Sequence, residues 1–215
     1  QVKGKVFLVG NTIVDSTLKY SKSQNSLDVL KDYNLAKNNY IILTTHREEN
    51  VDNPQILKNI YYAIKKVSEK YTIPIVFPMH PRTRERTKKH GLFSILKDIN
   101  QLQIIDPLPY LKMIQLMKFA NTIITDSGGI QEESCILKVP CITIRENTER
   151  PETVEVGANK IVGSSYENLV AALEKTISQK NNDWPNPYGD GHTSERIIDT
   201  CLYGAPKNEF TFEFK

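Results

Sequence analysis

Short apolar runs that alternate with helix-like segments constrain the fold of this chain more than any other feature of its sequence. The runs lie at residues 40–45, 73–79, 103–105, 123–124, 141–144 and 160–162. The segments between them place apolar residues at helical spacing, most clearly in residues 54–70. Strands that are apolar without alternation are covered by helices on both faces of their sheet. The pattern therefore predicts an α/β fold with a doubly wound, Rossmann-like parallel sheet.

The first 38 residues fit this sheet poorly. Residues 5–9 are predicted as a strand and residues 12–20 as a helix, but no further alternation follows until residue 40. We expect residues 1–38 to be the end of a different domain with a linker, and residues 204–215 to be a tail. Residues 39–203 are then the Rossmann-like domain with a C-terminal helix. Because the chain begins with Gln1, we expect it to be a piece of a longer protein.

Charge and cysteine content argue against several classes of partner. The 28 basic and 25 acidic residues give a net charge of +3, which is too small to indicate a nucleic-acid or membrane partner. The three cysteines fit neither a zinc site nor a disulfide framework, so we expect a reducing, cytoplasmic location. No apolar run approaches the roughly 20 residues of a membrane span. Metal-ligand spacing is also missing, and we expect no metal and no cofactor.

Polar residues follow four of the predicted strands. Ligands of an open parallel sheet bind beyond the carboxyl ends of its strands. The segments at these ends are THREEN (45–50), HPR (80–82), DSGG (126–129) and RENTER (145–150). A lone histidine is more often structural than catalytic, but His46 and His80 both lie at strand ends beside charged residues. This position favours a functional role for both, more strongly for His46.

The turn at Ser127, Gly128 and Gly129 predicts a phosphate site. Glycines at a strand-to-helix junction let backbone N–H groups approach a ligand, and the helix N-terminus adds partial positive charge. Glu133, one turn further on, would repel a phosphate but can accept hydrogen bonds from the hydroxyls of a ribose. Together these residues predict a site for a nucleoside diphosphate. The alternative is a tight turn with a capped helix, since the Gly-x-Gly-x-x-Gly and Walker patterns are both missing.

Five motifs occur in an order that is typical of one enzyme family. They are THREEN (45–50), PMHPRT (78–83), DSGGIQEES (126–134), RENTERPE (145–152) and NPYGDGHTSERI (186–197). Together they resemble the C-terminal half of non-hydrolysing UDP-N-acetylglucosamine 2-epimerases. VGNTIVDS (9–16) resembles the segment that ends the N-terminal domain of that family. The resemblance implies a GT-B fold, of which this chain holds the C-terminal domain.

The same resemblance implies a reaction and a set of UDP ligands. The family interconverts UDP-GlcNAc and UDP-ManNAc by elimination and re-addition of UDP, without NAD or metal. His46 would contact the diphosphate and help the leaving group to depart. The residues that would bind UDP are Ser127, Gly128, Gly129, Glu133, Arg145 and Arg150. The two arginines are assigned only as residues of the cleft.

In bacterial members, Arg47, Glu49 and His80 match positions linked to a second, activating UDP-GlcNAc site. The resemblance also implies a homodimer for the full-length protein, with UDP and UDP-GlcNAc as ligands. The N-terminal domain, which carries the acids that act near C2 of the sugar, is not part of this sequence. We therefore expect this chain alone to bind UDP weakly and not to epimerise, and we expect that missing domain to be a partner.

Two alternatives to an epimerase remain. The chain could be half of a GT-B glycosyltransferase, which would use the same diphosphate site to transfer a sugar to an acceptor. It could also be a standalone module that binds nucleotide sugars. An acceptor requirement would identify the first alternative, and a gene that ends near this length would identify the second.

Overall fold

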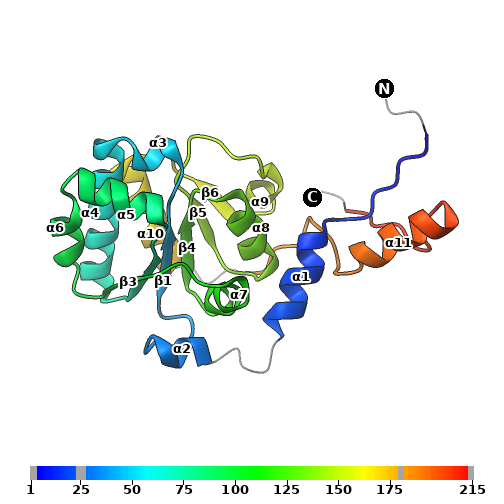
Figure 1. The fold of residues 1–215 in the computed structure, drawn as a ribbon, viewed down its shortest axis with the longest axis horizontal. Helices are drawn as coiled ribbons and strands as arrows, with labels where there is room; N and C mark the ends of the chain where they lie inside the picture. Colours follow the sequence, from blue (N-terminus) through cyan, green and yellow to red (C-terminus); the bar gives the residue numbers. More distant parts are fainter. Residues whose placement is uncertain (1–3, 23–27, 179–181, 213–215) are drawn as a thin grey trace.

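The computed structural model describes residues 4–22, 28–178 and 182–212. Its centre is a six-stranded parallel sheet with the strand order β3-β2-β1-β4-β5-β6 (Figure 1). The strands are β1 (Ile41–Thr44), β2 (Ile75–Pro78), β3 (Leu102–Ile105), β4 (Thr122–Thr125), β5 (Cys141–Thr143) and β6 (Asn159–Ile161). The prediction of a doubly wound, Rossmann-like α/β sheet is confirmed.

Helices cover both faces of the sheet, as the apolar strands require. On one face Ile41 and Leu43 pack with residues of α4 (Pro54–Tyr71), α6 (Phe93–Lys97) and α10 (Tyr166–Ser178). On the other face Ile42 packs with α2 (Asp28–Asp32) and α7 (Tyr110–Lys118). Successive side chains of β1 therefore enter opposite cores, which explains why the three residues before its terminal threonine are all apolar.

The sequence marks the start of α4 clearly. The side chain of Asn53 caps the helix by accepting from the N–H groups of Gln55 and Ile56, and Pro54 occupies the first turn. Two short helices were not predicted, namely α3 (Glu48–Val51) and α6. They are too short to show a helical period in the sequence, and α3 matters because it carries residues of the candidate site.

The segment before the sheet packs through α1 (Thr12–Ser21) against helices of the domain, including α7 and α8 (Gly128–Ile136). Val14 of this helix is buried with Cys135, Ile136 and Trp184. The predicted strand at residues 5–9 is wrong, because these residues form no regular element and no strand of the sheet pairs with them. The predicted domain boundaries stay predictions. Residues 1–3, 23–27 and 213–215 of the predicted first and last segments lie outside the described residues.

The strand order reverses its direction of growth between β1 and β4. These strands pair along their length, with Thr44 opposite Thr125, and their hydroxyl oxygens lie 2.7 Å apart. The chain that follows β1 and the chain that follows β4 leave toward opposite faces of the sheet, through α3 and α4 in one case and α8 in the other. Ligands of doubly wound sheets bind at this switch point. None of the helices within the described residues is long and apolar enough to span a membrane.

Candidate functional site

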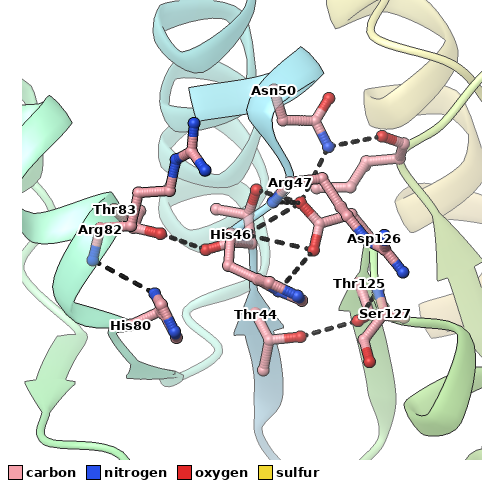
Figure 2. A network of polar contacts seen from close by, with 12 residues as sticks. Thr44, His46, Arg47, Asn50, His80, Arg82, Thr83, Thr125, Asp126 and Ser127 are labelled. Carbon is pink, nitrogen blue, oxygen red and sulfur yellow. Dashed lines mark hydrogen bonds and ion pairs between the residues drawn. The ribbon is translucent and has the colours of Figure 1, made fainter. Parts of the chain in front are cut away.

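The carboxylate of Asp126 joins the ends of β1 and β4 (Figure 2). Asp126 is fully buried. Its Oδ2 accepts from Thr45 Oγ1 at 2.7 Å, from the backbone nitrogens of His46 and Arg47 at 2.9 and 3.0 Å, and from Asn50 Nδ2 at 3.0 Å. Its Oδ1 lies 3.0 Å from His46 Nδ1. Oδ2 thus makes most of the bonds that fix the loop after β1, while Oδ1 faces the imidazole and also accepts from the backbone N–H of His46 at 3.2 Å.

These contacts keep Asp126 ionised. Burial by itself raises the pKa of this carboxyl, but the hydrogen bonds from His46, Asn50, Thr45 and Arg47 outweigh it and lower the pKa to about 2. Asn50 also donates to the carbonyl oxygen of Ile144 at 2.9 Å, which ties the end of β5 to the same network. The carboxylate is therefore a structural anion for the loop and a partner for His46.

Two imidazole rings stack at this end of the sheet. The rings of His46 and His80 have centroids 5.4 Å apart and are tilted by 38°. The side chain of His46 is 36% exposed, so the part of its ring that does not face Asp126 is open to solvent. His80 caps α5 (Pro81–Lys89) with its ring, because its Nδ1 accepts from the backbone N–H of Arg82 at 3.2 Å.

The start of α8 offers backbone donors. Ser127 is the N-cap with an extended backbone, but its hydroxyl makes no capping bond. The backbone N–H of Ser127 donates to Thr125 Oγ1 at 3.0 Å. Within the described residues, the N–H groups of Gly128, Gly129 and Ile130 have no acceptor. Unpaired N–H groups at a helix start are the kind of donors that bind anions.

The two glycines at this corner are not required by the protein itself. Neither has a positive φ, so neither backbone conformation needs glycine. A Cβ at Gly129 would meet nothing within 4 Å, and one at Gly128 would lie 3.7 Å from the guanidinium of Arg150. Alanine would stabilise a helix relative to glycine by about 1 kcal/mol. The interpretation of Ser127-Gly128-Gly129 as a tight turn therefore does not explain its glycines.

Arg150 lies over this helix start, but its charge is shared. Its Nε lies 2.7 Å from Glu132 Oε1, in an ion pair whose N–H is poorly aligned for a hydrogen bond. Asn11 Nδ2 donates to the same carboxylate oxygen at 3.2 Å. Burial raises the pKa of Glu132, and the positive charge of Arg150 opposes this rise. Glu132 thus links α8 to the residue that caps α1.

Glu133 is a buried carboxyl without an ion pair among the described residues. Its side chain belongs to the second turn of α8, and the residue is 9% exposed. Burial raises its pKa to about 7, the hydroxyl of Tyr110 opposes the rise, and the charge of Glu132 adds to it. Tyr110 Oη also lies 3.4 Å from Thr17 Oγ1. A buried carboxylate in this state favours a ligand that donates hydrogen bonds.

The remaining predicted residues gather around α3. Arg145, predicted to bind UDP, places its Nε 2.7 Å from Oε1 of Glu49, which was predicted for the second site. Arg47 donates its backbone N–H to Asp126, and its buried Nε has no acceptor in the described part of the chain. His80 lies beside His46. The structure thus places Glu49 against Arg145 and His80 against His46, while Arg47 is fixed to Asp126 through its backbone.

Sequence reasoning missed several residues of this site. Asp126 stands directly before Ser127 at a strand end, so its position was visible in the sequence although its role was not. Asn50, Tyr110 and Asn11 come from α3, α7 and the segment before α1, and only the fold brings them to the site. No group of three or more His, Cys, Asp and Glu side chains suited to a metal ion occurs in the described ranges.

Comparison with known proteins identifies the family of this chain. The sequence model of the family described as UDP-N-acetylglucosamine 2-epimerase matches residues 1–202. The chain belongs to this family. The UDP-N-acetylglucosamine 2-epimerase of Methanocaldococcus jannaschii is 49% identical over 205 residues, which cover 94% of this chain and 56% of the relative. The chain therefore spans about half the length of this epimerase.

Solved structures of the 2-epimerase family show the same fold. The M. jannaschii UDP-GlcNAc 2-epimerase in complex with UDP-GlcNAc and UDP superposes with a TM-score of 0.83 at 48% identity, covering 95% of this chain and 56% of that one. The S. aureus protein MnaA, solved with UDP, gives a TM-score of 0.81 at 33% identity over 96% of this chain and 57% of its own. The resemblance to the epimerase family and the GT-B half expected from it are both confirmed.

Proposed function

We propose that this chain is the UDP-binding half of a UDP-GlcNAc 2-epimerase, with the pyrophosphate of UDP held at the start of α8. The observation that carries this proposal is the pair Gly128 and Gly129. Their conformation is helical, the space beside Gly129 is open, and the neighbouring N–H groups have no acceptor in the described residues. Glycine at these positions costs helix stability, which is understandable if a ligand must approach the backbone closely.

The other residues fit distinct parts of a bound nucleotide. Arg150 over Gly128 supplies positive charge to the pyrophosphate. Glu133, one turn further along α8, accepts hydrogen bonds from the ribose hydroxyls. His46, at the facing strand end, contacts the leaving diphosphate. Elimination breaks the bond between C1 of the sugar and UDP while a base removes the proton at C2, and we assign that base to the half of the enzyme outside this sequence.

A second UDP-GlcNAc site beside the first is supported by the group around α3. The Nε of Arg47 is buried without an acceptor in the described residues, which favours an anionic ligand. His80 lies beside His46, the residue that precedes Arg47, and Glu49 is held by Arg145. We assign these three residues to an activating site that the epimerase half provides.

Gly129→Ala tests the phosphate site. The added methyl meets no protein atom, so we expect the variant to unfold at the same temperature as the parent or at a slightly higher one. We expect its affinity for UDP, measured by calorimetry, to fall by about 10-fold or more, because the methyl occupies the approach of the phosphate to the backbone. Uridine, which has no phosphate, is the control and should bind both proteins equally. If both proteins bound UDP equally, the proposal that the phosphate binds at this corner would be wrong.

The chain by itself is expected not to interconvert UDP-GlcNAc and UDP-ManNAc. Leaving-group contacts are available in this half, but the proposed C2 base is not. Incubation with UDP-GlcNAc, followed by proton NMR at the anomeric region, should show no UDP-ManNAc. The M. jannaschii enzyme serves as the positive control under the same conditions. Turnover by the isolated chain would mean that its own residues move the C2 proton.

A further inference from the structure

The Nδ1 atoms of His46 and His80 face polar groups of opposite kinds. Nδ1 of His46 faces Oδ1 of Asp126 at 3.0 Å, and this carboxylate is fully buried and ionised. An ionised carboxylate has no proton to donate and its lone pairs repel a bare ring nitrogen, so Nδ1 of His46 carries the proton at this close contact. Nδ1 of His80 faces the backbone N–H of Arg82 at 3.2 Å. A backbone N–H only donates, so Nδ1 of His80 carries no proton.

The tautomer of a neutral imidazole follows from these partners. We infer that the two stacked histidines are held in opposite tautomers, His46 with its proton on Nδ1 and His80 with its proton on Nε2. The positioning residues are Asp126 for His46 and the α5 amide of Arg82 for His80. This inference depends on the proposed function only for the roles of the two rings, because the tautomers themselves follow from contacts within the chain.

The two rings then present different groups to a ligand at this end of the sheet. Nε2 of His80 is a fixed hydrogen-bond donor. Nε2 of His46 is a bare acceptor when the ring is neutral, and it is the atom at which His46 gains or releases a proton. Once protonated, His46 donates from Nε2 to the departing diphosphate, while Asp126 remains the counterion on the other side of the ring. Asp126 thus leaves Nε2 of His46 as a nitrogen that can accept a proton from the ligand, whereas Nε2 of His80 already carries one.

The arrangement of donors around Asp126 predicts the effect of Asp126→Asn. Oδ2 receives four of the hydrogen bonds, so the amide oxygen of the introduced side chain should take this position and keep them. The amide NH₂ then takes the position of Oδ1 and points at Nδ1 of His46. It can only donate there, which drives His46 to the Nε2–H tautomer. The same replacement at a histidine–aspartate pair in a serine protease retains the geometry and imposes the wrong tautomer.

Long-range proton–nitrogen NMR of the chain labelled with ¹⁵N-histidine tests this directly. Spectra are recorded at a pH at which free imidazole is neutral, and His46→Asn and His80→Asn identify the two sets of signals. We expect the pattern of Nδ1–H for His46 and that of Nε2–H for His80. The inference would be overturned if both histidines showed the same tautomer, or if either ring averaged between the two tautomers. This measurement does not require a variant of Asp126.

Asp126→Asn is the second measurement. We expect the signals of His46 to change to the Nε2–H pattern and those of His80 to stay as they are, and an unchanged His46 would overturn the inference. In the longer enzyme the same variant should lower kcat by about 10²–10⁴-fold with little change in KM. Addition of UDP to the parent chain separates the two proposals. If UDP does not bind, the proposed function fails, while the tautomers can still be read.

Discussion

Asp126→Ala is expected to lower the free energy of unfolding by about 3–5 kcal/mol. The substitution leaves Thr45, Asn50 and two backbone N–H groups without their acceptor in a buried position. Donors left unsatisfied in this way cost about 1–3 kcal/mol each before relaxation, and water that enters the space recovers part of this. Urea denaturation at pH 7 measures the loss, and a loss below about 1 kcal/mol would show that Asp126 does not hold the loop after β1.

Asp106→Ala is the matched control for this variant. Asp106 also follows a strand directly, but its side chain is 93% exposed and pairs only with Arg84 at the surface. We expect its replacement to change stability by less than about 0.5 kcal/mol. Comparing the two variants shows whether the loss of stability comes from the burial of the Asp126 carboxylate or from the removal of any carboxylate at a strand end.

The stability conferred by Asp126 should also depend on pH. The pKa of this group is lowered from 3.8 in the unfolded chain to about 2 in the fold. Its contribution is therefore complete above pH 3.8 and is lost as the pH falls through about 2. Asp126→Ala should lack this part of the acid-induced loss of stability, whereas Asp106→Ala should retain it.

Glu133→Gln is expected to stabilise the unliganded chain and to weaken nucleotide binding. Burial raises the pKa of Glu133 from 4.5 to about 7, so the folded protein binds more protons than the unfolded chain between these values. The contribution of Glu133 to the free energy of unfolding therefore falls as the pH rises from about 4.5 to 7, and it stays low above pH 7. Glutamine removes this cost, and we expect a gain of about 1–3 kcal/mol at pH 8.

Urea denaturation at pH 5 and pH 8 measures this gain, which should be smaller at pH 5. Glu69→Gln is the control, because Glu69 is a half-exposed residue of α4 paired with Lys65, and its replacement should leave stability nearly unchanged at both values. A loss of stability in Glu133→Gln at pH 8 would mean that the carboxylate is satisfied in the fold.

Binding by Glu133→Gln should change in the opposite direction. If the carboxylate accepts from the ribose hydroxyls, calorimetry should show affinities for both UDP and uridine reduced by about 1–3 kcal/mol. This result differs from that expected for Gly129→Ala, which spares uridine. Unchanged affinity for both ligands would give Glu133 a purely structural role.

Several features of the fold and the site follow from the sequence alone. Apolar runs such as residues 40–45 bury on both faces, so they specify a parallel sheet covered by helices. The polar residues after these runs mark the edge of the sheet at which the candidate site lies, and the glycines after Asp126 mark the corner proposed for the phosphate. Local pattern is sufficient here because strand period, capping and glycine placement are properties of a few consecutive residues.

Only the tertiary structure decided which of these strand ends meet. β1 pairs with β4, and this places His46 beside Asp126, 80 residues further along the chain. The tertiary structure also pairs Arg150 with Glu132 and Arg145 with Glu49. It buries Glu133 beside Tyr110. Strand order depends on how whole helices and strands pack, so the protonation states and partners of the site residues are set by contacts that no local stretch of sequence contains.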